Sequence, residues 1–239
     1  MKKYIYQLSE EEFYNFLLAY KKGVELISQE ENLITFATYE PVEDLTPQAV
    51  QEVKIVPQER IFRPFTVGSF LIHRPDLIPI SVNPGMAFGT GLHPTTKVCL
   101  RLIEKYFLPG WTALDVGCGS GILSIALAKL GAREVLAIDI DERAVEETKE
   151  NAKRNGVSLQ VKQATPADLE ESYQFLVANL ELPIFEKEAT HIKRLFSVRG
   201  VFSGLYGGDD LEKFLKLFQD HKVVKIVKMR GWYGVVLEK

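Results

Sequence analysis

A glycine-rich loop carries the clearest chemical signal in this sequence. Residues 112–116 have the pattern of an apolar strand, and Gly117-Cys118-Gly119-Ser120-Gly121 follows directly and opens a helix. Glycine has no Cβ, so such a loop lets the backbone approach a ligand at the carboxyl end of the strand. The spacing is G-x-G-x-G, one residue shorter than the G-x-G-x-x-G of dinucleotide-binding proteins. We expect Gly117, Gly119 and Gly121 to bind a cofactor; an ordinary strand-to-helix turn is the alternative.

Two carboxylates near this loop indicate the kind of cofactor. Asp115 lies two residues before the first glycine, where a negative charge would repel a pyrophosphate and favour a cation. Asp139 ends the next apolar strand, about 20 residues after the loop, at the position of an acceptor for ribose hydroxyls. Both fit S-adenosylmethionine, which carries an ammonium and a sulfonium, better than NAD or FAD. The alternative role for Asp139, and more so for Asp141, is N-capping of the following helix.

Strand and helix signals alternate from residue 95 to the C-terminus. The expected elements are helices 95–106, 121–130, 142–155, 184–196 and 209–218, and strands 112–116, 134–139, 159–163, 173–179, 200–204, 223–229 and 231–237. Short apolar strands between longer helices predict an α/β fold with a parallel sheet covered on both faces. The last two strands have no helix between them and must pair antiparallel. This is the inventory of a Rossmann-like seven-stranded sheet of the methyltransferase type.

The N-terminal residues predict a separate small α+β module. Residues 2–8 alternate like a strand, Ser9 and Glu12 have capping-box spacing, and strands are expected over 24–28 and 33–39, which gives a βαββ unit. Prolines punctuate residues 41–60, where Thr46-Pro47 could cap a short helix that runs to about Val56. We therefore expect a recognition module at 1–40, a linker at 41–60 and the catalytic domain at 61–239.

Composition and charge exclude several classes of protein. The net charge is −3, which argues against a dedicated nucleic-acid binder, and two cysteines are too few for a disulfide framework or a zinc site, so no metal is expected. No apolar run approaches the ~18 residues that span a membrane, and no signal peptide is evident, so we expect a cytoplasmic protein. Residues 1–60 hold 6 Lys/Arg against 11 Asp/Glu, a net of −5. That acidity is either a solvated face or a docking surface for a basic partner.

Two further motifs carry a resemblance to a known family. They are Gly-Met-Ala-Phe-Gly-Thr-Gly-Leu-His-Pro-Thr-Thr at residues 85–96 and Val-Ala-Asn-Leu-Glu-Leu-Pro at residues 177–183. With the glycine loop, they resemble the class I S-adenosylmethionine-dependent methyltransferases, and the first resembles the signature loop of the PrmA family. The resemblance runs from about residue 64 to the C-terminus. It implies a protein-lysine N-methyltransferase whose partner is large-subunit ribosomal protein eleven, methylated on lysine side chains and its N-terminal α-amine.

The sequence departs from that family at both ends. The family's N-terminal module is typically a complete ferredoxin-like βαββαβ unit, whereas the module here is shortened. The family's last strand tends to carry an acidic-Trp pair, and this chain has Gly231-Trp232-Tyr233. The first departure affects how a substrate would dock and leaves the chemistry unchanged.

The resemblance also implies roles for individual residues. Thr96, Gly117, Asp139 and Asn179 should contact the cofactor, and Asn179 could also accept a hydrogen bond from the target amine and so act in catalysis. The alternative role for Asn179 is that of a turn residue before Pro183. Phe88 would stack over the cofactor or the amine, or else pack beneath the signature loop.

Three further polar residues have competing interpretations. His93 before Pro94 is better explained as a helix cap than as a base. Glu181 would attract the substrate ammonium or be a solvated carboxylate. Asp168 follows the third strand and could lie near the adenine.

Other functions remain as alternatives at this point. A methyltransferase of a different protein or of a small molecule is the nearest, although the amide-nitrogen enzymes carry Asn-Pro-Pro-Tyr where this chain has Asn-Leu-Glu-Leu at 179–182. A Rossmann oxidoreductase is disfavoured by Asp115 and the loop spacing. A catalytically silent binding module would have lost one of the cofactor motifs, and all of them are retained.

Overall fold

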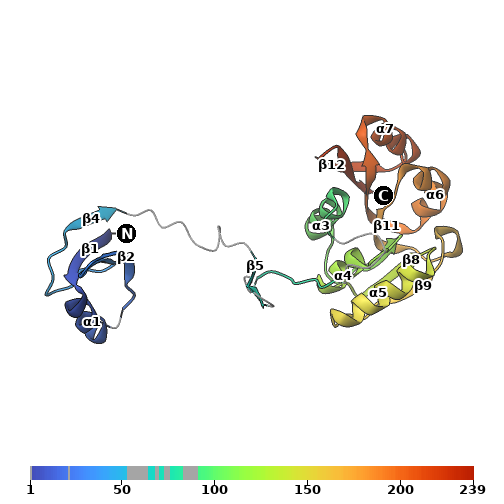
Figure 1. Cartoon of the computed structure of the whole chain (residues 1–239). Helices are drawn as coiled ribbons and strands as arrows, with labels where there is room; N and C mark the ends of the chain where they lie inside the picture. Colours follow the sequence, from blue (N-terminus) through green and yellow to red (C-terminus); the bar gives the residue numbers. More distant parts are fainter. Residues whose placement is uncertain (1, 21, 53–63, 68–69, 73–75, 83–90) are drawn as a thin grey trace. The chain divides into compact units, whose positions relative to one another are not determined.

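The computed structural model describes residues 2–20, 22–52, 64–67, 70–72, 76–82 and 91–239. The chain divides into two compact units, Met1–Leu77 and Ile78–Lys239. Figure 1 shows the elements of each unit, which are described separately below.

In the part of the N-terminal unit that the structure describes, one helix packs on a four-stranded antiparallel sheet. Its main elements are β1 (Lys2–Ser9), α1 (Glu10–Ala19), β2 (Glu25–Glu30), β3 (Leu33–Thr38) and β4 (Ala49–Glu52), in the sheet order β2-β3-β1-β4. The expected capping box starts α1, because Ser9 accepts from the backbone of Glu12 and the Glu12 carboxylate accepts from the backbone of Ser9. Phe13 of α1 packs on Phe36 of β3 with ring centroids 4.9 Å apart.

Strand β4 lies in the range that we expected to be a linker with a short helix. It pairs with the free edge of β1, and the register places Val50 opposite Tyr4. The strand order is that of a ferredoxin-like unit, but the connection over residues 39–48 contains no helix. Pairing with a distant strand therefore outweighs the local helix signal at Thr46-Pro47. A short hairpin follows, in which β5 (Phe65–Val67) pairs antiparallel with β6 (Phe70–Ile72).

The second unit is the expected Rossmann-like α/β sheet. Its elements are α3 (Pro94–Tyr106), β7 (Thr112–Val116), α4 (Ile122–Lys129), β8 (Glu134–Asp139), α5 (Glu142–Arg154), β9 (Gln160–Gln163), a 3-10 turn η1 (Pro166–Asp168), β10 (Tyr173–Asn179), α6 (Leu182–Arg194), β11 (Phe196–Tyr206), α7 (Gly207–Leu217), β12 (Lys222–Met229) and β13 (Trp232–Glu238). The sheet order is β12-β13-β11-β10-β7-β8-β9. Strand β13 pairs antiparallel with both β11 and β12, and the other neighbouring strands pair parallel. The predicted fold class is confirmed.

Alternation along the strands builds a hydrophobic core on each face of this sheet. Leu176 of β10 belongs to a cluster with Phe185 of α6 and Phe214 of α7. Its neighbour Phe175 belongs to a second cluster with Leu102 of α3 and residues of α4. Because successive strand side chains point to opposite faces, α6 and α7 cover one face and α3 and α4 cover the other.

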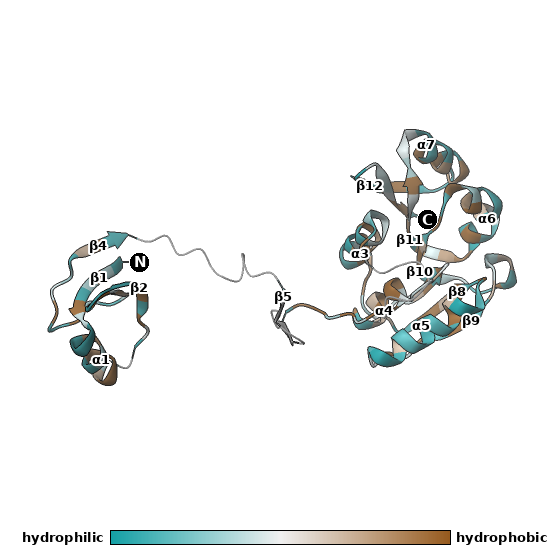
Figure 2. Cartoon of the chain, viewed as in Figure 1, coloured by the Kyte–Doolittle hydropathy of each residue, from teal (hydrophilic) through white to brown (hydrophobic). Residues whose placement is uncertain are grey.

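The helices differ in how much of their surface is buried. Most residues of α4 are buried, whereas α5 buries only one stripe, and in Figure 2 α5 is mostly teal. Helix α6 ends at Arg194 with Leu195 as its C-cap, so β11 begins at Phe196, earlier than expected from the sequence. None of the helices in the described ranges is long and apolar enough to cross a membrane.

Candidate active site

The glycine loop connects β7 to α4 and is held by the neighbouring strand. The backbone N–H groups of Gly117 and Cys118 both donate to Ile138 O, at 2.8 and 3.0 Å. Gly117 has φ +75°, and a Cβ at this position would lie 2.4 Å from Leu180 Cδ2. The loop after β7 and the loop after β10 therefore touch at a point where only glycine fits.

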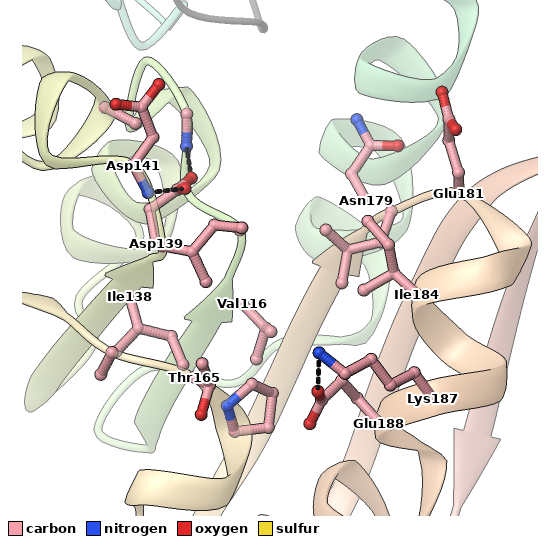
Figure 3. A pocket seen from close by; sticks show the side chains of 17 residues that line it. Val116, Ile138, Asp139, Asp141, Thr165, Asn179, Glu181, Ile184, Lys187 and Glu188 are labelled. Atoms are coloured by element: carbon pink, nitrogen blue, oxygen red, sulfur yellow. Dashed lines mark hydrogen bonds and ion pairs between the residues drawn. The ribbon is translucent and has the colours of Figure 1, made fainter.

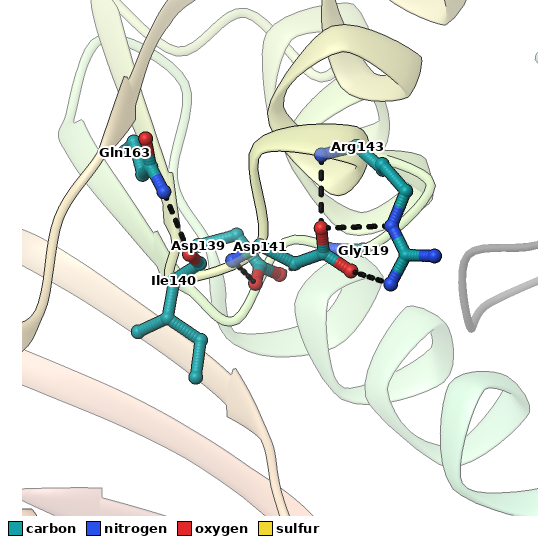
Figure 4. A network of polar contacts seen from close by, with 6 residues as sticks. All are labelled: Gly119, Asp139, Ile140, Asp141, Arg143 and Gln163. Atoms are coloured by element: carbon teal, nitrogen blue, oxygen red, sulfur yellow. Dashed lines mark hydrogen bonds and ion pairs between the residues drawn. The ribbon is translucent and has the colours of Figure 1, made fainter.

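Asp139 links this loop to the end of β8. Its Oδ2 accepts from Gly119 N and its Oδ1 accepts from Asp141 N, both at 3.0 Å, as Figure 4 shows. Asp141 caps α5, and its hydrogen bonds with the Arg143 side chain and backbone hold the pKa of the Asp141 carboxyl below its usual value. A carboxylate has about four acceptor positions. Asp139 therefore keeps acceptor capacity for the hydroxyls of a ligand.

A cavity of ≈ 560 Å³ opens beside the glycine loop and Asp139. It lies where β7 and β10 adjoin and the chain order reverses, the usual ligand site of an open α/β sheet. Figure 3 shows Asp139 and Asn179 on opposite walls. The lining residues come from the ends of β7, β8, β9 and β10 and from the start of α6: Val116, Gly117, Gly119, Ile138, Asp139, Ile140, Asp141, Ala144, Ala164, Thr165, Pro166, Asn179, Leu180, Glu181, Ile184, Lys187 and Glu188.

Negative charge dominates the wall of this cavity. Among the described residues that line it, four carry carboxylates, Asp139, Asp141, Glu181 and Glu188, and one carries a positive charge, Lys187. Such a wall favours a ligand with a positive end and disfavours the two phosphates of a dinucleotide.

The structure brings four of the predicted cofactor-binding residues together and separates three others. Gly117, Gly119, Asp139 and Asn179 line the cavity, and Thr96, Asp115 and Gly121 do not. Thr96 is fully buried on α3, and its Oγ1 has no hydrogen-bond partner among the described residues. Gly121 is the N-cap of α4, where a Cβ would meet Thr148. Phe88 lies outside the described residues.

Asp115 lies within β7, beneath the cavity wall. It is fully buried, and its Oδ2 accepts from Ser124 Oγ of α4 at 2.5 Å. Burial raises the pKa of this carboxyl to about 7. Its other oxygen has no partner among the described residues. Asp115 thus joins β7 to α4.

His93, Asp168 and Glu181, for which the sequence left two roles open, differ in whether they line the cavity. His93 is the N-cap of α3, where its Nδ1 accepts from Thr95 N, and its ring lies edge-on to Trp232. Asp168 caps the η1 turn by accepting from Thr165 N at 2.8 Å, and it does not line the cavity. Glu181 is exposed and lines the cavity.

The sequence reasoning missed the far end of the cavity. Ala164, Thr165 and Pro166 come from the loop after β9, and Ile184 and Glu188 come from α6. The Thr-Pro pair after a strand signalled a turn at the carboxyl edge of the sheet. An acidic residue in the apolar stripe of α6 was the second available signal.

Comparisons with known proteins agree with this geometry. The sequence model of the family described as ribosomal protein L11 methyltransferase (PrmA) matches residues 46–239. The chain belongs to the PrmA family. A ribosomal protein L11 methyltransferase of Aquifex aeolicus is 44% identical over all of this chain and 98% of that relative, and one of Thermotoga maritima is 38% identical over 78% of this chain and 74% of that relative. A crystal structure of ribosomal protein L11 methylase from Lactobacillus delbrueckii subsp. bulgaricus superposes with a TM-score of 0.61 at 30% identity, covering 65% of this chain and 82% of that chain.

As a PrmA-family member, the protein is an S-adenosylmethionine-dependent methyltransferase. The cavity fits this cofactor. Asp139 offers acceptors to ribose hydroxyls, the glycine loop allows close approach, and the excess of carboxylates suits an ammonium and a sulfonium. Family membership also removes the oxidoreductase alternative.

The raised pKa of Asp115 predicts a pH-dependent stability difference between this methyltransferase and its Asp115→Asn variant. The carboxyl binds its proton more tightly when folded, so its contribution to stability is fully present below the unfolded pKa of 3.8 and is lost as pH rises toward 7. Asparagine does not titrate. Relative to the variant, wild type should lose roughly 3 kcal/mol of unfolding free energy between pH 4.5 and pH 8, as measured by urea denaturation. Equal differences at both pH values would contradict the burial argument.

Replacing Gly204 with alanine should displace the chain that follows Asn179. Gly204 has φ +99°, and a Cβ there would lie 2.1 Å from Leu180 O. We expect Gly204→Ala to lower the melting temperature and to weaken cofactor binding about 10-fold or more, measured by calorimetry. Gly207→Ala is the matched control, because Gly207 also has positive φ (+76°) but has open space around its Cβ position. Equal effects of the two substitutions would mean that backbone strain alone is responsible.

Proposed function

We propose that this protein methylates amines of ribosomal protein L11, namely lysine side chains and the N-terminal α-amine. The observation that carries the proposal is the 44% identity, over the whole chain, to a relative named ribosomal protein L11 methyltransferase. The alignment includes the N-terminal unit, so the short module of this chain has a counterpart in that relative. The acidic cavity wall supports a cationic substrate group as well as a cationic cofactor.

The residues of the cavity can bind and orient the reacting groups. When bound, S-adenosylmethionine supplies an activated methyl group. The amine has an ordinary pKa near 10.4 and must be neutral to attack, so the site must favour loss of its proton. Glu181, exposed on the cavity wall, would attract the ammonium, and the side-chain oxygen of Asn179 would accept an N–H and direct the lone pair. The apolar side chains of Leu180 and Ile184 would disfavour the charged form next to them.

A direct assay tests this proposal. The purified protein is incubated with labelled S-adenosylmethionine and purified L11, and the modified residues are located by peptide mass spectrometry. We expect label on lysine side chains and on the N-terminus, and L11 whose amines have been acetylated should take up none. Asn179→Ala should lower the rate while the variant remains folded. No label on L11, together with label on another protein in a lysate, would show that the substrate is different.

We also propose that the N-terminal unit recognises the protein substrate. It carries the acidic excess noted above, whereas every residue that lines the cavity lies in the unit Ile78–Lys239. Ribosomal proteins are generally basic, so charge complementarity supports a docking role.

A further inference from the structure

Glu188 is an acidic residue on the buried face of α6, where the other buried side chains are apolar. The buried residues of this helix are Leu182, Phe185, Glu188, Ala189 and Ile192, a stripe with helical spacing. Glu188 is only 8% exposed. Glutamate is almost never buried unless it is paired, so this position requires a partner for the carboxylate.

The carboxylate of Glu188 is only half satisfied by the protein. Its Oε1 lies 3.5 Å from Lys187 Nζ, a contact at the long end of ion-pair distances, and the Lys187 side chain is largely exposed. Its Oε2 is buried and has no hydrogen-bond partner among the described residues. Glu188 also lines the cavity, and Figure 3 shows its carboxylate pointing toward the wall that carries Thr165. An unpaired acceptor oxygen is therefore buried beside the cavity, where a ligand could donate a hydrogen bond to it.

The surroundings of Glu188 indicate which part of the ligand provides that donor. Asp139 would accept the ribose hydroxyls, and Figure 3 shows the apolar side chains of Ile138 and Val116 on the wall between Asp139 and Glu188. The apolar residues Ala164 and Pro166 also line the cavity. A flat base with apolar faces suits such walls, and a base also has a polar edge. A carboxylate only accepts hydrogen bonds, so the edge that meets it must carry an N–H.

We propose that Glu188 Oε2 accepts a hydrogen bond from the exocyclic 6-amino group of the adenine of S-adenosylmethionine and so makes the site selective for adenine. A 6-oxopurine would place a carbonyl oxygen where adenine places its amino donor, so two acceptors would face each other at that position. The inference rests on the cofactor assignment of the proposed function and is independent of the identity of the methyl acceptor. Glu188 is a specificity residue for the base and takes no part in the transfer of the methyl group.

Calorimetry with a pair of cofactor analogues tests this assignment without turnover. S-adenosylhomocysteine and S-inosylhomocysteine differ only in the base: the 6-amino group is replaced by a 6-oxo group, and N1 carries a proton in the inosyl compound. Wild type should bind the adenosyl compound at least about 10-fold more tightly, because a site built around a donor rejects an analogue that lacks it. Glu188→Gln should reduce this ratio to about 3-fold or less, because the amide can present either an acceptor or a donor.

Two controls separate this role from a structural one. Glu186→Gln removes the same charge from an exposed position on the same helix and should keep the wild-type ratio. The second control needs no variant: the wild-type protein should also bind a purine analogue without any 6-substituent about 10-fold more weakly than S-adenosylhomocysteine.

Each outcome of these measurements decides the inference. A wild-type protein that binds the analogues equally, or a folded Glu188→Gln variant that keeps the full ratio, would overturn the role of Glu188. Failure of wild type to bind S-adenosylhomocysteine at all would overturn the cofactor assignment as well. Binding with the expected ratios but without methylation of L11 would leave the inference standing and overturn only the proposed substrate.

Discussion

Asp139→Ala should weaken binding of S-adenosylmethionine at least about 10-fold, with little change in the amount of folded protein. The substitution removes the carboxylate that would accept hydrogen bonds from the ribose hydroxyls. Hydrogen bonds to a charged group contribute roughly 1.5 to 3 kcal/mol each. The substitution also frees Gly119 N and Asp141 N, which now donate to Asp139 at 3.0 Å. The loop after β7 and the start of α5 would therefore lose a shared anchor. Isothermal calorimetry gives the dissociation constant directly.

Two further variants show which of these effects dominates. Asp139→Asn keeps the shape of the side chain and one acceptor oxygen, so it should bind more weakly than wild type and more tightly than the alanine variant. Glu142→Gln changes an exposed neighbouring carboxylate that does not line the cavity and should bind as wild type does. An unchanged affinity of Asp139→Ala would remove Asp139 from the cofactor site.

The α/β part of the fold could be predicted from local sequence because its signals are local. Strands β7, β8 and β10 have the bounds expected from their apolar runs, and each is followed by a helix with its own start signal. Parallel strands bring their carboxyl ends to one edge of the sheet. Residues that end or follow these strands, such as Gly117, Asp139 and Asn179, must therefore meet, and the structure places all three on one cavity.

The elements that the sequence did not reveal depend on distant contacts. Strand β4 is only four residues long, and it forms because it pairs with the edge of β1. Glu188 reaches the cavity because α6 packs on the face of the sheet next to the cavity. No local sequence pattern predicts this packing. Asp115 is a different case, since it lies within β7 and shares a face with Ala113. Strand alternation directs it into the layer of α3 and α4, where Ser124 donates to it, rather than into the cavity.

A variant that begins at Ile78 should separate cofactor binding from recognition of the protein substrate. All of the described residues that line the cavity lie after this position, so the folded variant should bind S-adenosylmethionine with the affinity of the full-length protein. The omitted residues 1–77 hold 8 Lys/Arg against 12 Asp/Glu, a net of −4. We expect kcat/KM for intact L11 to fall about 10-fold or more, because a tethered acidic unit raises the local concentration of a basic substrate.

Salt and substrate size provide the controls for this last prediction. Added salt should slow the full-length enzyme on intact L11 more than it slows the truncated variant, because screening acts only on the interaction that the truncation removes. A short peptide with the N-terminal residues of L11 lacks most of the basic surface of the intact protein, so both proteins should methylate it at similar rates. If the folded variant instead methylates intact L11 at the full-length rate, the N-terminal unit has no docking role. Selection of the substrate would then lie in residues 78–239, where Glu181, the exposed carboxylate of the described cavity wall, is an available contact for a basic protein.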